Sequence, residues 1–250
     1  MAGTIRIGIG GWTFEPWRGV FYPKGLTQKK ELHFASRALN SIEINGTYYS
    51  TFKETSWCNW RDETPDDFVF AVKASRYVTN RKDLTTAGES MDRFMAQGLT
   101  ALGPKLGPIN WQFMGTKKFN ADEMAGFLKL LPRERDGVAM RHAIEPRHES
   151  FKTEAFYDLV RKHDVAVVLD LGGEFPEIEV ESGDFAFARF MATSETEENG
   201  VTASELKALA KRVKAWAKSK DVFAYFISGA KVRNPAAARA LMAETGVKRD

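Results

Sequence analysis

Eight short apolar runs recur along the chain, and longer stretches of mixed polarity separate them. Runs of this length, rich in valine, isoleucine and phenylalanine, are typical of strands that are buried on both faces of a sheet. The candidate strands are Ile5–Gly10, Ser41–Asn45, Phe68–Lys73, Pro108–Phe113, His142–Arg147, Ala166–Leu171, Phe185–Phe190 and Val222–Ser228.

Between most of these runs, apolar residues recur at the spacing of an amphipathic helix. One such stripe runs from Met124 to Leu131, and Asn120 with Glu123 ahead of it has the form of a capping box. A second capping box, Thr202 with Glu205, precedes a further helix. Other helical stripes lie within residues 32–39, 91–102, 156–163 and 206–216, and Asn234-Pro235 opens a last helix.

Strict alternation of strand and helix predicts a parallel sheet. Eight such units without a break in composition predict that the sheet closes, and 250 residues is the usual size of one such barrel. We therefore expect an α/β protein with a single (β/α)8 TIM-like barrel over residues 1–250. The segment 172–181 is short and contains Pro176, so the sixth helix is expected to be reduced or missing.

Composition and charge narrow the class of protein. The net charge of +3 is too small to favour nucleic acid as the partner, since no concentrated basic stripe accompanies it. No apolar stretch approaches the ~20 residues of a membrane span, and the residues ahead of the first strand lead us to expect no secretory signal. The single cysteine, Cys58, permits no intrachain disulfide. We expect a cytoplasmic protein without membrane contact, and its oligomeric state stays open.

Polar and charged side chains stand at the carboxyl ends of five predicted strands. Such residues are costly to bury unless they serve a purpose, and strand ends of a barrel are where active sites form. Alternation along each strand places the polar residues on one face and bulky apolar residues on the other. The residues concerned are Glu43, Asn45, Lys73, Asn110, Gln112, Glu145, Arg147 and Asp170, with His148 directly after Arg147.

These residue types suit acid–base chemistry on an anion. We predict Lys73 and Glu145 as the acid–base pair and Glu43 as a second carboxylate. Lys73 has three open roles, namely a base, a Schiff-base nucleophile or a fixed positive charge. Arg147 offers a planar fork for a carboxylate or phosphate. Further candidates for substrate binding are His148, Asn45, Gln112, Asp170 and Ser228.

One structural interpretation requires no ligand. In it the same residues form an interior network of ion pairs, in which Glu43 and Glu145 hold Lys73. His148 likewise suits either a functional role or a single structural hydrogen bond in a loop.

A basic rim is expected on the same side as the strand ends. The loops after the third, fourth and eighth strands carry Arg76, Arg81, Lys82, Lys117, Lys118, Lys231 and Arg233. A cleft lined in this way attracts anions. The loop that begins at Ser228 and Gly229 and opens a helix could bind phosphate, or it could be an ordinary solvated loop.

The first loop, from Gly8 to Pro23, is unusually aromatic and either packs over the barrel or stacks on a ligand. Tyr22 is its candidate for the site, because it carries a hydroxyl.

This loop, together with later motifs, resembles the YecE-like family of bacterial proteins, a domain of unknown function. The matching motifs are Ser41-Ile42-Glu43-Ile44-Asn45-Gly46-Thr47-Tyr48-Tyr49, Phe68-Val69-Phe70-Ala71-Val72-Lys73, Leu106-Gly107-Pro108 with Gln112, and Ile144-Glu145-x-Arg147-His148-x-Ser150-Phe151. The resemblance implies a TIM-like barrel. It also implies a site at Glu43, Asn45, Lys73, Gln112, Glu145 and Arg147, but it implies no activity.

The chain departs from the family pattern at several positions. Arg189-Phe190-Met191-Ala192 stands where the family commonly has Arg-Leu-His-Gly, and Asn80 replaces a histidine. Ser228 stands where an asparagine is usual. Two histidines that could take part in acid–base chemistry are therefore absent.

Three functions fit these observations, and the residues leave open whether the site is catalytic. The favoured function is an enzyme of isomerase, lyase or hydrolase type that acts on a small anionic metabolite. A metal-dependent phosphodiesterase or nuclease is an alternative, but of four histidines only His148 lies near the carboxylates, so we expect no metal and no cofactor. A non-catalytic, anion-binding regulatory barrel is the other alternative.

Overall fold

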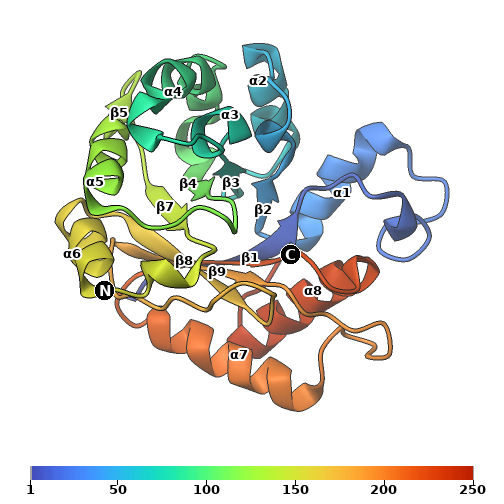
Figure 1. Ribbon diagram of the computed structural model, residues 1–250. Helices are drawn as coiled ribbons and strands as arrows, with labels where there is room; N and C mark the ends of the chain where they lie inside the picture. The colour runs from blue at the N-terminus through green and yellow to red at the C-terminus, as the bar shows by residue number, and fades with distance from the viewer. Residues whose placement is uncertain (1, 250) are drawn as a thin grey trace.

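The computed structural model describes residues 2–249, in which eight parallel strands close into a barrel (Figure 1). Around the barrel the strands follow the order β1-β10-β9-β8-β7-β4-β3-β2, and every neighbouring pair is parallel. The predicted (β/α)8 architecture is therefore confirmed. The barrel strands are β1 (Ile5–Gly10), β2 (Ser41–Ile44), β3 (Val69–Lys73), β4 (Leu106–Gln112), β7 (His142–Glu145), β8 (Ala166–Leu171), β9 (Phe185–Phe190) and β10 (Asp221–Phe226).

Four predicted strands extend too far at their carboxyl ends, and in β4 the excess is the single residue Phe113. β2 stops at Ile44, because Asn45 adopts a helical backbone (φ −94°, ψ −19°) and begins a short 3-10 turn. Arg147 and Ser228 likewise lie in loops, beyond the ends of β7 and β10. The expectation that Asn45 and Arg147 sit on a strand face is wrong, since the alternation rule stops where the strand stops.

A two-stranded hairpin, β5 (Glu134–Arg135) with β6 (Val138–Ala139), stands outside the barrel and was not predicted. Its turn residues Asp136 and Gly137 have positive φ angles of 52° and 76°. This is the backbone that an Asp-Gly pair favours in a tight hairpin turn.

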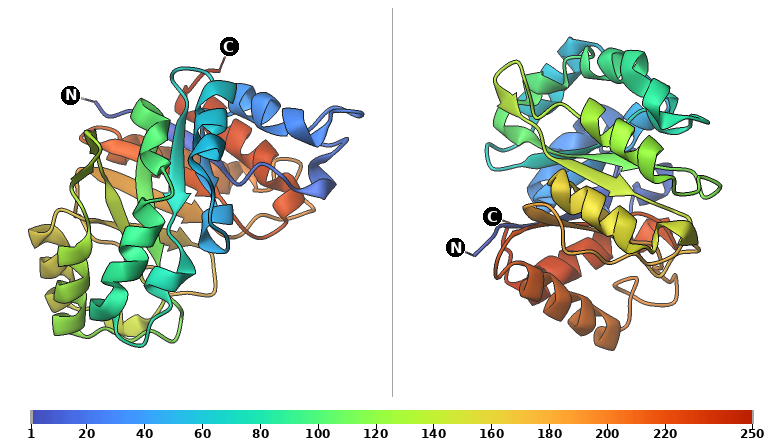
Figure 2. Two further views of the ribbon diagram at one scale, coloured as in Figure 1. Left: turned by 90° about the horizontal axis from the view of Figure 1, so that it is seen from above. Right: turned by 60° about the vertical axis from the view of Figure 1, so that its left-hand side comes forward.

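Helices surround the barrel on its outer side (Figure 2). Several begin at the predicted caps: Asn120 accepts a hydrogen bond from the Glu123 amide, and Thr202 with Glu205 forms a complete capping box. The box at Asn120 is incomplete, because the Glu123 carboxylate instead accepts from the Leu84 amide. The helices are α1 (Glu31–Ala38), α2 (Glu54–Glu63), α3 (Arg76–Thr79), α4 (Gly88–Met95), α5 (Ala121–Leu130), α6 (Glu154–Lys162), α7 (Ala203–Trp216) and α8 (Asn234–Thr245).

The apolar core has two layers. The larger layer lies between strands and helices and includes Phe70 and Val72, whereas Ala71 belongs to a smaller cluster inside the barrel. This division confirms the alternation predicted for the third strand. The inner cluster consists of Ala71, Ala143, Ala166, Val168, Phe185, Phe187, Phe223 and Tyr225. It fills the barrel below the strand ends, so a layer of apolar side chains lies directly beneath the polar residues at the mouth.

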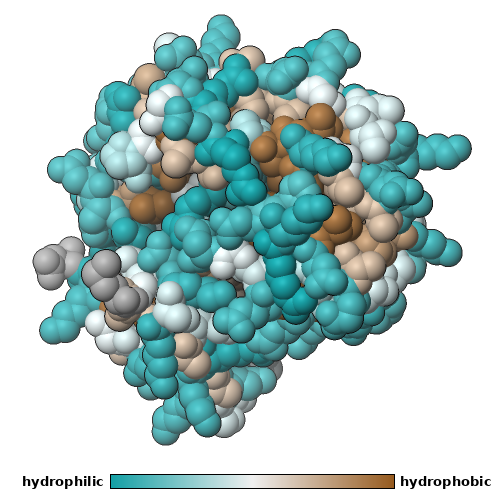
Figure 3. Space-filling model, turned by 90° about the vertical axis from the view of Figure 1, so that its left-hand side faces the viewer, coloured by the Kyte–Doolittle hydropathy of each residue, from teal (hydrophilic) through white to brown (hydrophobic). Residues whose placement is uncertain are grey.

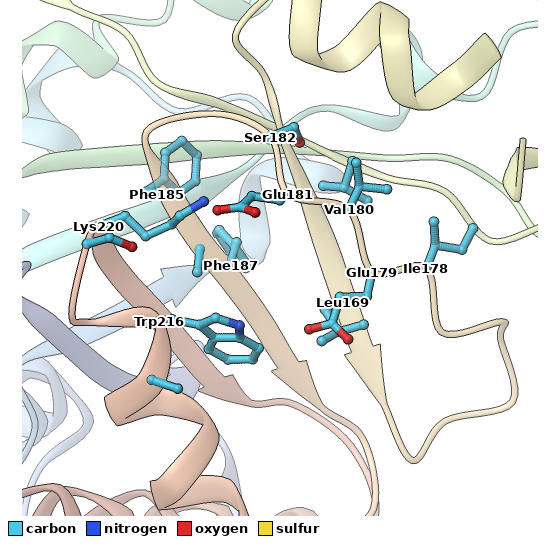
Figure 4. Close-up of a pocket in the computed structure, with 14 residues that line it drawn as sticks. Leu169, Ile178, Glu179, Val180, Glu181, Ser182, Phe185, Phe187, Trp216 and Lys220 are labelled. Atoms are coloured by element: carbon cyan, nitrogen blue, oxygen red, sulfur yellow. The ribbon is translucent and has the colours of Figure 1, made fainter. Parts of the chain in front are cut away.

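The sixth helix is missing, as expected. Within the described residues, the chain from the end of β8 to the start of β9 forms no helix. Residues 178–182 cover part of the exposed strands instead and leave a hollow of about 400 Å³. In this hollow Trp216, at the end of α7, faces Leu169 and Phe187 (Figure 4).

The outer surface on the side of α5 and α6 is mainly hydrophilic, and its apolar residues form separate patches (Figure 3). Among the described residues, no helix combines the length and apolar character that a membrane crossing requires.

Gly8 lies where β1 and β2 approach most closely, and its replacement tests the barrel. A Cβ atom at this position would stand 1.9 Å from the backbone carbonyl oxygen of Ser41, and neither strand can move without opening the sheet. We expect Gly8→Ala to lower the free energy of unfolding by about 2 kcal/mol or more in urea denaturation. Gly88→Ala is the control, because nothing lies within 4 Å of its added methyl group and alanine favours a helix. Equal stability of the two variants would contradict this packing.

Candidate functional site at the barrel mouth

A buried arginine, Arg189 at the end of β9, joins two carboxylates across the mouth of the barrel. Its Nη1 donates to both oxygens of Glu145, at 3.0 and 3.1 Å, and its Nη2 donates to Glu43 Oε2 at 3.0 Å. The side chain of Arg189 is 2% exposed and both carboxylates are fully buried. Three strand ends that are distant in sequence are thus tied together by one guanidinium.

Amides and a second guanidinium complete the hydrogen bonds of Glu145. Asn110 Nδ2 donates to Glu145 Oε2 at 2.7 Å and to Glu43 Oε1 at 3.1 Å. Gln112 Nε2 donates to Glu145 Oε1 at 2.6 Å. Arg147 adds Nε at 2.7 Å and Nη2 at 2.6 Å on the same oxygen.

This arrangement keeps Glu145 ionised. Burial by itself raises the pKa of a carboxyl group, but the positive charges of Arg189 and Arg147 outweigh it and hold the pKa of Glu145 well below its usual range. A carboxylate held in this way is a fixed negative charge at neutral pH.

Lys73, at the end of β3, stands beside this network without joining it. It is 8% exposed, and within residues 2–249 its ammonium makes neither an ion pair nor a hydrogen bond. Its Nζ lies 4.2 Å from the centre of the Tyr48 ring. Burial lowers the pKa of Lys73 to about 8, and the positive charge of Arg189 adds to this effect while the nearby carboxylates oppose it.

The predicted interior ion-pair network therefore exists, but its central cation is different. Arg189 takes the place that the sequence suggested for Lys73, because its two-pronged guanidinium reaches both carboxylates at once. Lys73 is left with an uncommitted ammonium.

Asp170, near the end of β8, is the second uncommitted group. It is 3% exposed, and neither of its carboxyl oxygens accepts a hydrogen bond from the described residues. The nearest cation, Arg147, keeps its Nε 3.9 Å from Oδ2. Burial, together with the negative charge of Glu145, raises the pKa of Asp170 to about 8. Asp170 is therefore mainly protonated at neutral pH.

Other predicted site residues make different contacts. The Tyr22 hydroxyl does not join the cluster, because it donates to the Trp12 carbonyl oxygen within the first loop. His148 Nδ1 accepts from the Ser150 amide at 3.1 Å and so caps a short 3-10 helix. The Ser228 carbonyl oxygen accepts from Thr193 Oγ1 at 3.0 Å. Asn45 differs from these, since its buried Oδ1 has no hydrogen-bond donor in the described chain.

Arg189 is the residue that sequence analysis did not assign to the site. A signal was present, because Phe185, Phe187 and Arg189 alternate along one strand and therefore share a face. The two phenylalanines lie inside the barrel, and the arginine follows them on the same face at the mouth.

No three histidine, cysteine, aspartate or glutamate side chains within residues 2–249 come together in a way that could hold a metal ion. The cluster at the mouth instead combines three carboxyl groups with three cations. Short ion pairs occupy Glu43 and Glu145, whereas Asp170 has only the longer contact of 3.9 Å with Arg147.

Comparison with known proteins identifies relatives of the whole barrel. The family model described as "Protein of unknown function DUF72" matches residues 6–250. The UPF0759 protein YecE of Escherichia coli K12 is 27% identical over 150 residues, which are 59% of this chain and 50% of that protein. The chain thus spans about half the length of the curated relatives it matches.

Solved structures share the fold. A DUF72 family protein from Thermotoga maritima has a TM-score of 0.74 and 26% identity, with 98% of this chain and 99% of that chain covered. D-psicose 3-epimerase has a TM-score of 0.52 and 11% identity, with 97% and 96% covered. The likeness to the epimerase concerns the barrel fold alone.

Replacement of Asp170 tests its unusual protonation. A carboxyl group whose pKa rises from 3.8 in the unfolded chain to about 8 in the folded one contributes stability at low pH, and that contribution is lost as the pH rises through 8. Asp170→Asn has no such titration. We expect the stability of the wild type, relative to this variant, to fall by more than about 1 kcal/mol between pH 5 and pH 9 in urea denaturation.

The matched control is Asp92→Asn, which alters an exposed aspartate on α4. Its stability difference from the wild type is expected to stay constant over the same pH range. A constant difference for Asp170→Asn as well would show that the Asp170 carboxyl titrates normally.

Proposed function

The chain belongs to the DUF72 family of proteins of unknown function, and from the mouth of its barrel we propose an enzyme that performs acid–base chemistry on a small anionic metabolite. The proposal covers reactions of the isomerase, lyase or hydrolase type. Its site is the carboxyl-terminal face of the strands, where loops reach the solvent.

One observation carries the proposal: Lys73 and Asp170 are uncommitted in a cluster whose other charges are paired. Burial lowers the pKa of Lys73 to about 8 and raises the pKa of Asp170 to about 8. Groups with pKa values near the working pH are the most effective in proton transfer. Lys73 is the base that takes a proton from the substrate, and Asp170 is the acid that returns one.

The contacts favour Asp170 over Glu145 as the acid of this pair. Glu145 stays ionised, because Arg189 and Arg147 stabilise its negative charge. Its role in this proposal is to position Arg147 and to raise the pKa of Asp170. Glu43, which shares Arg189 with Glu145, likewise positions the network rather than moving a proton.

Arg147 is the proposed anion clamp. It uses Nε and Nη2 on Glu145, which leaves Nη1 for a ligand. Its side chain is 16% exposed, and the guanidinium carbon lies 4.3 Å from the centre of the Phe175 ring. Its guanidinium places a positive charge where the barrel opens, which favours a carboxylate or phosphate.

Hydrogen exchange tests proton transfer before the reaction is known. Ligands are first selected by their effect on the melting temperature in a panel of sugar acids and sugar phosphates, since binding to the native state raises it. Each is then incubated with the protein in D2O, and loss of a carbon-bound proton signal is followed by NMR. We expect Lys73→Met and Asp170→Asn to slow this exchange or turnover roughly 100-fold or more.

Lys207→Met, which removes an exposed lysine from α7, is the control and is expected to match the wild-type rate. A ligand that binds but undergoes neither exchange nor turnover in the wild type would instead favour the non-catalytic, anion-binding barrel. Unchanged rates in both site variants would remove Lys73 and Asp170 from the mechanism.

A further inference from the structure

Exposed aromatic side chains gather on the rim of the barrel beside Lys73. Tyr49 is 62% exposed and Tyr77 is 64% exposed, which is unusual for side chains of this size. Tyr49 follows the short turn after β2, and Tyr77 lies in α3 directly after β3. The strands that carry Glu43 and Lys73 therefore lead straight into these two rings.

An arginine without an acidic partner lies next to both rings. The guanidinium carbon of Arg76 is 5.6 Å from the centre of the Tyr49 ring and 5.5 Å from that of Tyr77. In the part of the chain that the structure describes, Arg76 forms no ion pair and no side-chain hydrogen bond, and it is exposed. Its charge is therefore available to a ligand. Tyr49, Arg76 and Tyr77 are called the rim patch below.

Tyr48 connects the rim patch to the proposed site. Its ring meets the Tyr49 ring edge-on, with centres 4.9 Å apart, and its other neighbour is Lys73 Nζ at 4.2 Å. Its hydroxyl is within hydrogen-bond distance of both polar atoms of the Asn80 side chain, which holds the ring in place. Two ring contacts thus connect the exposed rim patch to the buried Lys73.

We propose that the rim patch binds a free nucleoside monophosphate, with the base stacked on its tyrosines and the phosphate paired with Arg76. The inference rests on the proposed function and names the class of its anionic substrate. Exposed tyrosines offer flat faces on which any base can stack, and a guanidinium can stack on a base or pair with a phosphate. A sugar phosphate without a base would leave the two tyrosines without a role.

Matched ligands isolate the contribution of the base. Adenosine 5′-monophosphate and ribose 5-phosphate carry the same phosphate on the same sugar, and only the first has a base. We expect isothermal titration calorimetry of the full chain to give roughly tenfold or tighter binding for the nucleotide. Tyr49→Ala combined with Tyr77→Ala should remove that preference and leave the weaker binding of ribose 5-phosphate unchanged.

Arg76→Gln should weaken binding of both ligands, because it removes a charge that faces the phosphate. Its matched control is Arg161→Gln, which alters an arginine 5.9 Å from the Tyr157 ring on α6, and this change should leave both affinities as in the wild type. All four replaced side chains lie on the surface or at its edge, so the melting temperature serves as a check on folding.

The outcomes separate this inference from the proposed function. Equal binding of both ligands, weakened by Lys73→Met but not by loss of the tyrosines, overturns the nucleotide inference and leaves the anion site intact. Binding of a single-stranded oligonucleotide in preference to the free nucleotide also overturns it, as does absence of binding by either small ligand. A base preference together with affinities that Lys73→Met leaves unchanged supports the rim patch and counts against the proposed site.

Discussion

The buried guanidinium of Arg189 determines the arrangement of the barrel mouth. A charge taken out of water is costly, and this one is offset by two carboxylates that it contacts at 3.0 to 3.1 Å. Loss of one partner in such a pair typically costs about 3–5 kcal/mol, because the remaining charge stays buried. The ion pairs with Arg189 therefore do two things for Glu43 and Glu145: they offset the cost of burying the negative charges, and they hold both carboxylates at defined positions.

The protonation of the neighbouring groups follows from that arrangement. With Glu145 committed to Arg189 and Arg147, its negative charge acts on Asp170 and raises the pKa of that carboxyl group. The positive charge of Arg189 acts in the opposite sense on the lysine across the mouth and helps to lower the pKa of Lys73. The apolar cluster below, which includes Phe187 and Tyr225, excludes water and strengthens both effects. Burial first, and the charges of the paired network after it, thus set the pKa values of Lys73 and Asp170.

These pKa shifts matter because the chain lacks two histidines that the family pattern would supply. Histidine is suited to proton transfer because its ordinary pKa lies near neutrality. Burial and neighbouring charge bring Lys73 and Asp170 into the same range from opposite directions. The absence of those histidines therefore does not by itself remove acid–base chemistry from the barrel mouth, and Arg189, in the motif that has lost one of them, organises the groups that remain.

The sequence by itself determined the barrel, most strand positions, the missing sixth helix and the side of the barrel on which Glu43, Lys73, Gln112, Glu145 and Asp170 gather. These features follow from local periodicity, which each strand carries in its own residues. Strand ends were less certain, because the helical turn at Asn45 depends on the loop that follows it. Only the tertiary structure decided which charges pair. Arg189 and Lys73 are both cations at strand ends, and nothing local distinguishes them. Across the closed barrel, the two glutamates lie within reach of Arg189, whereas Lys73 and Asp170 form no side-chain hydrogen bond among the described residues. This pairing depends on contacts between strands that lie far apart in the chain.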